Sequence, residues 1–118
     1  MSNKDEIMAR LKLPVATAET IPGRSVTGYV GPAFGVVARS VGLARGFKGV
    51  IKSLRRGEVK EFSDTLEVAR HHAVERMIGN AIDLGADAVI AMRFDSGEVG
   101  GQGGMAEIVA YGTAVTLD

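Results

Sequence analysis

The chain has 118 residues, no cysteine and a formal net charge of zero. This length is typical of one domain, and the lack of cysteine excludes disulfides, thiolate metal ligands and a cysteine nucleophile. Apolar residues make up 46% of the sequence and aromatic residues only 5%, which indicates a thin core of small aliphatic side chains. The sequence contains no run of about 18 apolar residues and no signal-peptide pattern at its start. We therefore expect a cytoplasmic protein without a membrane span.

The first part of the chain is predicted to be an extension, residues 1–14, before a single domain of residues 15–118. Residues 2–13 fit a short capped helix and a loosely docked segment equally well. A short strand is expected at Val15–Glu19. Ile21–Gly23 follows as a type II turn, because it has proline at the first central position and glycine at the second.

The next two elements differ in period. Residues 24–39 are rich in β-prone side chains but are interrupted by glycines and a proline, which indicates a strand with bulges, a bend or a close backbone approach. Residues 43–54 place apolar side chains at helical spacing and predict a short helix. Two glycines inside this helix cost about 1 kcal/mol each relative to alanine, so it needs tertiary support.

The longest predicted element is a helix that follows a linker at 58–62. Ser63 or Asp64 is the expected N-cap and Gly85 the glycine after the C-terminus. An alanine-rich apolar stripe along this helix predicts close packing on a sheet and leaves room for a second contact. The stripe consists of Leu66, Ala69, Ala73, Met77, Ala81 and Leu84, and is widened by Val74, Ile78 and Ile82.

Two strands complete the chain. Residues 86–94 are almost continuously apolar, which is typical of a strand covered on both faces. Residues 95–104 are expected to be a glycine-rich loop, and residues 105–117 a long closing strand. The order of elements predicts an α+β fold, with an antiparallel sheet packed by one long helix and one shorter helix.

The two histidines, His71 and His72, are candidate ligands for a divalent metal ion together with Glu75. Adjacent helical residues point about 100° apart, so both histidines cannot readily bind one metal, whereas His71 and Glu75 share a face. Two ligands are too few for a closed site. A metal site would therefore need several copies of the chain, and ordinary solvent-facing residues remain the alternative.

A basic segment between residues 39 and 60 carries seven Lys/Arg and one acid, a local charge of +6. Such a helix face can bind an anionic partner, a membrane surface or a nucleic acid. No aromatic residue interleaves the basic face, so base stacking is not indicated and nucleic acid is not favoured. A solvated face, or salt bridges to a neighbouring subunit, is the alternative. The anion-binding candidates are Arg45, Lys48, Lys52, Arg55 and Arg56.

No motif points to an enzyme. The stretch SGEVGGQGG lacks the ending of a phosphate-binding loop and precedes a strand rather than a helix. The acids are spread along the chain, and Asp64 with Glu67 is better explained by helix capping. The chain also contains no G-x-S-x-G and no H-E-x-x-H. A small-ligand carrier or an enzyme with a pocket between subunits remains a rival interpretation.

Three stretches together resemble the YbjQ-like family of small bacterial and archaeal proteins, which carries a heavy-metal-binding label. They are TAETIPGRSVTGYVGPAFGVVARS, RRGEVKEFSDTLEVARHHAVERMIGNAIDLGADAVIAMRFD and AEIVAYGTAVTL, and the likeness covers residues 17–117. The resemblance implies a dodecin-like α+β subunit and a ring-shaped homopentamer whose assembly uses extra strands. It brings no enzymatic activity.

The resemblance also marks polar positions as candidates for assembly or function. The chain departs from the family pattern at His71 and His72, where relatives often carry acids. This departure weakens the metal label for this chain. We expect a non-enzymatic homo-oligomer, and the family resemblance implies metal binding. The matched polar positions are Glu19, Glu58, Glu61, Arg70, Arg76, Asp87, Arg93 and Glu107.

Overall fold

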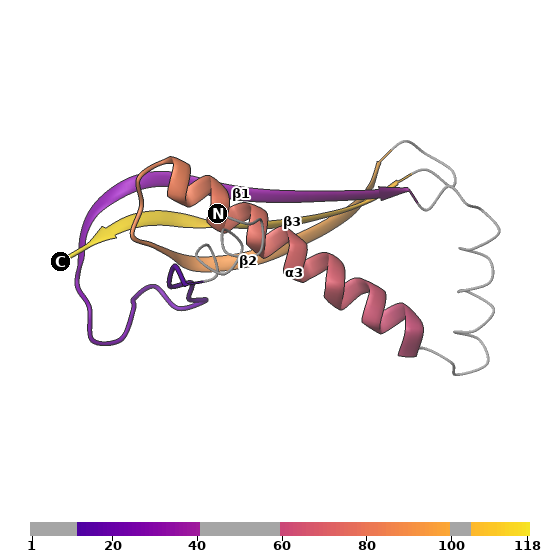
Figure 1. The fold of residues 1–118 in the computed structure, drawn as a ribbon, viewed down its shortest axis with the longest axis horizontal. Helices are drawn as coiled ribbons and strands as arrows, with labels where there is room; N and C mark the ends of the chain where they lie inside the picture. Colours follow the sequence, from indigo (N-terminus) through magenta and orange to yellow (C-terminus); the bar gives the residue numbers. More distant parts are fainter. Residues whose placement is uncertain (1–11, 41–59, 100–104) are drawn as a thin grey trace, which may run out of the picture.

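The computed structural model describes residues 12–40, 60–99 and 105–118. In this part of the chain one helix lies on one face of a three-stranded antiparallel sheet with the strand order β1-β3-β2 (Figure 1). The predicted α+β class is confirmed. The predicted short helix at 43–54 lies outside the described residues, as does almost all of the predicted helix at 2–13. The elements are β1 (Val26–Ser40), α3 (Lys60–Asp83), β2 (Ala88–Val99) and β3 (Met105–Leu117).

The segment before β1 adds to the free edge of β2. Val15 forms a single parallel bridge with Val89, and the amide of Ala91 donates to the carbonyl of Ala18 at 2.8 Å. The strand predicted at Val15–Glu19 is thus reduced to a short parallel addition. The predicted turn is confirmed, because the amide of Arg24 donates to the carbonyl of Ile21 at 3.1 Å and Gly23 has a φ of 78°.

β1 bends and carries the predicted irregularities. Its register with β3 shifts between Val26 and Gly28 and again between Tyr29 and Gly31. Gly35 is the predicted close approach, because a Cβ at this position would overlap the backbone of α3 at Ala73 and Met77. The absence of a side chain at Gly35 therefore lets the helix lie directly on the strand.

Helix α3 begins at Lys60, three residues before the predicted N-cap. Lys60 and Glu61 are good helix formers, so the helix extends past the capping signature at Ser63 and into the predicted linker. The C-terminus is as predicted: Gly85 has a φ of 83°, its amide donates to Ile82, and the amide of Ala86 donates to Ala81. This pair of bonds is a Schellman motif. Among the described residues, no helix is long and apolar enough to cross a membrane.

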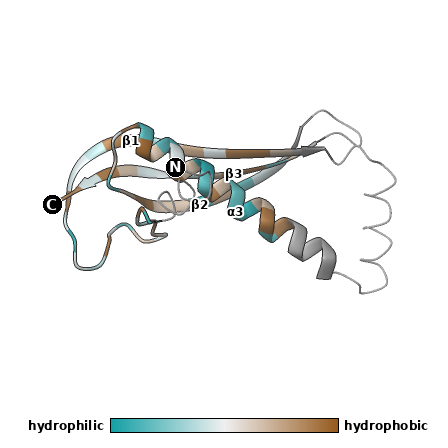
Figure 2. Ribbon diagram, viewed as in Figure 1, coloured by the Kyte–Doolittle hydropathy of each residue, from teal (hydrophilic) through white to brown (hydrophobic). Residues whose placement is uncertain are grey.

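The core lies between α3 and the sheet. Ala69, Ala73, Met77 and Ala81 are at most 2% exposed, which confirms the alanine-rich stripe. Hydrophobic and hydrophilic residues are interleaved along α3, as expected for a helix with one buried face (Figure 2). The sheet side of this core consists of Ala33, Val37, Val89, Ile108, Ala110 and Ala114.

Two members of the predicted stripe are exposed instead. Ile82 follows Ala81 directly, so it points about 100° away from the buried face. Leu84 lies beyond the last helical residue, in the turn that Gly85 closes. The buried side chains of α3 therefore end at Ala81, while Ile78 is buried and Leu66 and Val74 pack against the core as predicted.

β2 differs from its prediction at its second half. Ala88 and Val89 are fully buried as expected, but Arg93 and Phe94 are exposed in the single chain. The strand also continues through the first half of the predicted loop at 95–104, because pairing with β3 extends to Val99. Ladder hydrogen bonds therefore override the local loop preference of these residues. Since α3 packs mainly on β1 and β3, the helix side of β2 is less covered.

Candidate functional site

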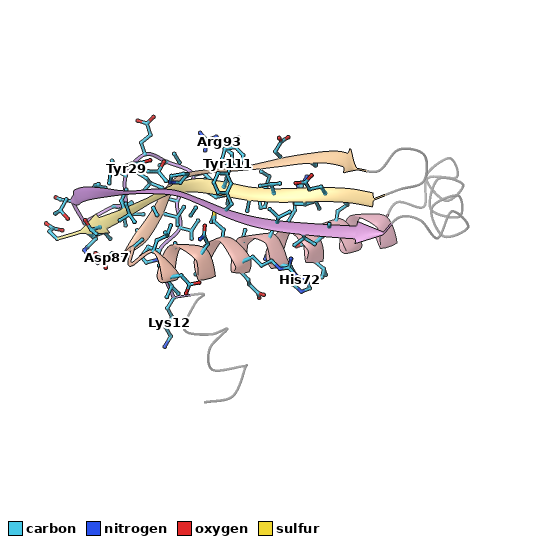
Figure 3. The ribbon with its side chains drawn as sticks, turned by 90° about the horizontal axis from the view of Figure 1, so that it is seen from above. Lys12, Tyr29, His72, Asp87, Arg93 and Tyr111 are labelled. Carbon is cyan, nitrogen blue, oxygen red and sulfur yellow. The ribbon has the colours of Figure 1, made fainter. Side chains whose placement is uncertain are left out.

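The candidate metal ligands lie on the outer surface of α3. His71 and His72 are exposed, and Figure 3 shows His72 on the side of the helix away from the sheet. His71 Nε2 lies 3.9 Å from Glu67 Oε1, and both side chains are more than 70% exposed, at 75% and 72%. The structure therefore pairs His71 with Glu67, one turn earlier, and not with Glu75. Glu67 also lies four residues from His71, so the sequence could have identified it as a neighbour of His71 by the same rule as Glu75.

These donors do not form a metal centre within one chain. In residues 12–40, 60–99 and 105–118, no group of three or more His, Asp or Glu side chains could hold a metal ion. Protein metal sites normally need three or four protein ligands. The pair formed by His71 and Glu67 would need further ligands from another copy.

The candidate anion-binding residues lie outside the part of the chain that the structure describes. They are Arg45, Lys48, Lys52, Arg55 and Arg56.

Three of the polar positions marked by the resemblance hold backbone groups in place. Arg76 Nη1 donates to the carbonyl of Val36 at 2.6 Å, and Arg93 Nη1 donates to the carbonyl of Thr17 at 2.8 Å. Asp87 Oδ2 accepts the amide hydrogen of Leu117 at 2.9 Å. Each bond ties together segments that lie far apart in the sequence. We therefore assign Arg76, Asp87 and Arg93 a positioning role within the subunit.

Arg76 acts together with Asn80, a residue that sequence reasoning missed. Asn80 Oδ1 accepts the amide hydrogen of Phe34 at 2.9 Å, while Arg76 binds the carbonyl of Val36. Both backbone groups belong to the edge strand β1, so α3 partly occupies its hydrogen-bonding edge. No sequence pattern distinguishes an asparagine with this role.

The sheet face opposite α3 carries two rows of side chains. Along β1, buried Ala33, Gly35 and Val37 alternate with exposed residues, so Phe34 and Val36 point away from the helix. Phe34 is 52% exposed and Tyr111 is 39% exposed, and Figure 3 shows Tyr111 beside Arg93. Exposed apolar groups gathered in this way mark interaction surfaces. We call the two rows, Phe34–Tyr111–Arg93 and Val36–Val109–Asp95, the open-face patch.

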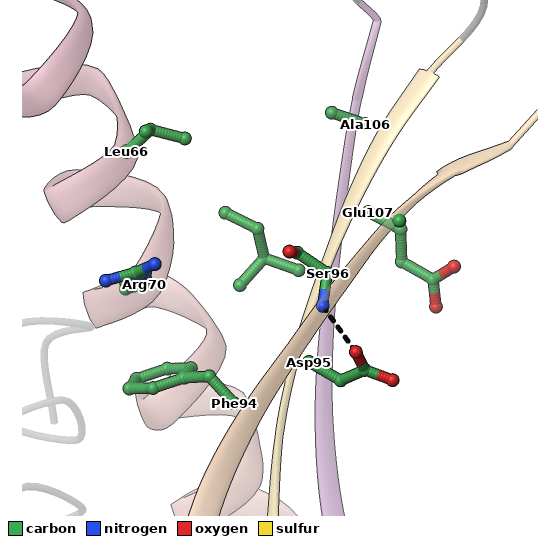
Figure 4. A pocket seen from close by; sticks show the side chains of 9 residues that line it. Leu66, Arg70, Phe94, Asp95, Ser96, Ala106 and Glu107 are labelled. Carbon is green, nitrogen blue, oxygen red and sulfur yellow. Dashed lines mark hydrogen bonds between the residues drawn. The ribbon is translucent and has the colours of Figure 1, made fainter.

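On the helix side, a cleft of about 430 Å³ separates the N-terminal half of α3 from β2 and β3 (Figure 4). The guanidinium carbon of Arg70 lies 5.6 Å from the centre of the Phe94 ring, a cation–π distance. The sequence marked Arg70 as a matched position but indicated no cleft, because the cleft depends on how α3 crosses the sheet. Its lining residues are Leu66, Arg70, Phe94, Asp95, Ser96, Gly97, Ala106, Glu107 and Ile108.

Comparison with solved structures supports the fold alone. A Pediococcus pentosaceus protein of unknown function, assigned to the DUF74 family, superposes with a TM-score of 0.51 at 16% sequence identity. The superposition covers 88% of this chain and 96% of that chain. At this identity the likeness carries no information about activity.

Comparison of sequences identifies the family. The chain is 43% identical over 104 residues to the UPF0145 protein of Bradyrhizobium sp. (strain ORS 278), covering 88% of this chain and 92% of the relative. It is 48% identical over 103 residues to the UPF0145 protein of Saccharolobus islandicus (strain Y.G.57.14 / Yellowstone #1), covering 87% and 89%. Residues 13–118 match the YbjQ family model, which is described as "putative heavy-metal-binding". The chain therefore belongs to the YbjQ family, whose relatives in bacteria and archaea carry no enzymatic name.

Proposed function

We propose that this protein is a non-enzymatic cytoplasmic homo-oligomer, in which dodecin-like subunits assemble into a ring-shaped homopentamer. Residues 15–118 form the assembling domain and residues 1–14 precede it as an extension. The observation that carries the proposal is the open-face patch. Phe34, Val36 and Tyr111 are each at least 39% exposed on one sheet face of a single chain. Burying these side chains against a second copy removes apolar surface from water.

The edge of β1 provides a second support. β1 lies at one end of the strand order, and no other described strand pairs with its outer side. A strand edge with free backbone groups can pair with a strand from another chain. Arg76 and Asn80 occupy two of these groups, at Phe34 and Val36, so strand addition would use the rest of this edge.

The test is the mass of the particle in solution. We expect light scattering and native mass spectrometry to give five times the 12.4 kDa mass of the chain. Replacing Phe34 and Tyr111 together with glutamate places two charges in the open-face patch. We expect this variant to be a monomer, because burying unpaired charges in an interface costs several kcal/mol.

The control is Val68→Glu, which adds the same charge to an apolar side chain that is 49% exposed on α3. It should keep the wild-type mass. Circular dichroism of each variant separates loss of assembly from loss of folding. A monomeric wild-type protein would overturn the proposal, and a different multiple would overturn the pentamer while keeping self-assembly.

Metal binding is the second candidate function, and the exposed pair formed by His71 and Glu67 favours it. A carboxylate and an imidazole at this spacing supply two ligands from one helix face. The remaining ligands would come from the same face of another copy, which makes assembly a condition for binding. His72 and Glu75, the other predicted ligands, lie on the same helix within one turn of His71.

We expect native mass spectra of the oligomer to show stoichiometric zinc, copper or nickel after addition of each metal. His71→Gln should abolish this adduct, while His72→Gln and Glu75→Gln tell which neighbours take part. Binding that survives the loss of both histidines would place the metal elsewhere. An intact oligomer without any metal adduct would overturn the proposal of metal binding and leave the assembly proposal standing.

A further inference from the structure

The cleft beside α3 exists because the helix covers the sheet unevenly. α3 packs mainly on β1 and β3, so within residues 12–40, 60–99 and 105–118 no helix covers the helix side of β2 near Phe94 and Ser96. The resulting space of about 430 Å³ is within the size range of small-ligand sites, about 300–1,000 Å³. Its lining residues come from α3, β2 and β3 (Figure 4).

The cleft has an apolar wall. Leu66 from α3, Phe94 from β2 and Ile108 from β3 all line it. Phe94 is 39% exposed although it faces α3, whereas Ile108 at the base is only 7% exposed. An apolar ligand segment that covers Phe94 would remove this surface from water.

The cleft also has one positive charge next to that wall. Arg70 stacks on the ring of Phe94, with 5.6 Å from its guanidinium carbon to the ring centre. Among the described residues, no carboxylate forms an ion pair with Arg70. This sets Arg70 apart from Arg76 and Arg93, whose guanidinium groups bind backbone carbonyls. Its donors are thus available to a ligand.

The two acids among the lining residues leave the positive charge of Arg70 unopposed, because their carboxylates lie on the other face of the sheet. Asp95 and Glu107 line the same space, but Figure 4 shows their carboxylates pointing away from Arg70. Asp95 Oδ1 instead accepts the amide hydrogen of Ser96 at 2.9 Å. One guanidinium balances one negative charge, so a ligand with a single charge leaves no charge unpaired in the cleft. A planar carboxylate also matches the fork of an arginine in shape, and its single charge is balanced by that arginine. A phosphate dianion carries more negative charge than a single cation balances.

We propose that the cleft is a binding site for an apolar monocarboxylate, such as a medium-chain fatty acid. The hydrocarbon tail lies against Leu66, Phe94 and Ile108, and the carboxylate accepts hydrogen bonds from Arg70. Ser96, on the same wall, is placed to donate a further hydrogen bond from its hydroxyl. All lining residues of the cleft named above belong to one chain, so this proposal does not depend on the assembly proposed above.

The experiment is isothermal titration of the full-length protein with octanoate, kept below its micelle concentration. Octanol has a similar tail without the charge, and acetate has the charge without the tail. We expect saturable binding of octanoate. Octanol lacks the hydrogen bond to a charged group and acetate lacks the apolar contact, and each of these interactions contributes at least about a factor of ten in affinity. Both compounds should therefore bind at least about tenfold more weakly than octanoate.

Two variants locate the site. Arg70→Gln should lower the affinity for octanoate about tenfold or more and leave the affinity for octanol unchanged. The control is Lys12→Gln, which removes a positive charge from an exposed residue elsewhere (Figure 3). It should bind octanoate with the affinity of the wild type. Ser96→Phe fills the cleft from β2 and should abolish binding of both ligands while the circular dichroism spectrum is retained.

Three outcomes would overturn the proposal: no saturable octanoate binding, equal affinity for octanol and octanoate, or wild-type affinity in Arg70→Gln. The particle mass is measured on the same samples. A monomer that binds octanoate would overturn only the assembly proposal, and an oligomer that does not bind it would overturn only this one.

Discussion

Replacing Gly35 with alanine is expected to unfold the protein or to lower its free energy of unfolding by about 3 kcal/mol or more. A Cβ on Gly35 would overlap the carbonyl oxygen of Ala73 and the backbone nitrogen of Met77. Backbone atoms cannot rotate away as the end of a side chain can, so α3 would have to lift off β1. The loss is large against a total stability of about 5–15 kcal/mol for a domain.

Urea denaturation followed by circular dichroism measures this effect at one fixed protein concentration, because assembly makes stability depend on concentration. Gly97→Ala is the matched control, since Gly97 also lies in a strand but a Cβ there meets no atom within 4 Å. We expect Gly97→Ala to change stability by less than about 0.5 kcal/mol. Equal midpoints for the two variants would show that α3 does not approach β1 as described.

Truncating Met77 to alanine is expected to lower the free energy of unfolding by about 2–5 kcal/mol. Met77 is fully buried and is the largest side chain that α3 places in a core otherwise built largely from alanine and valine. Its neighbours on the helix, Ala73 and Ala81, have no side-chain length with which to fill the cavity. The cavity would therefore persist, and its cost would add to the lost apolar burial.

Met77→Leu is the control, because it keeps the volume and should cost less than about 1.5 kcal/mol. Thermal and urea unfolding of the two variants give the comparison. If Met77→Ala were as stable as Met77→Leu, the centre of the core could not lie between α3 and the sheet at this residue. Retention of secondary structure by both variants at low temperature would confirm that only packing has changed.

Local signals in the sequence predicted several parts of the fold correctly. Gly85 ends α3 because a residue at positive φ closes the helix, and glycine adopts that conformation without strain. Gly23 after Pro22 predicted the type II turn for the same reason. The alanine-rich face of α3 predicted close packing on a sheet, because helical spacing alone determines which side chains share a face.

Features that depend on a partner strand were predicted less well. Ser96 and Gly97 have the local preference of a loop, but they lie in β2 because β3 supplies their ladder partners Ile108 and Glu107. Similarly, Phe94 belongs to an apolar run yet remains exposed in the single chain, because α3 packs mainly on the other strands. Its neighbour Arg93 is exposed because it lies on the sheet face opposite α3.

The candidate sites show the same division. The histidines at 71 and 72 could be recognised from residue type, and helical spacing placed His71 one turn from acids on both sides. Only the structure selected Glu67 as its neighbour, because side-chain conformation decides which acid it meets. The sequence by itself determined the family, through its matched stretches, and the α+β class, through the order of its elements. It also determined the turns at Gly23 and Gly85 and the buried face of α3, because these follow from contacts between residues close in the chain. The tertiary structure alone decided the open-face patch, the bonds of Arg76 and Asn80 to the edge of β1, and the cleft at Arg70, because each joins residues on different elements.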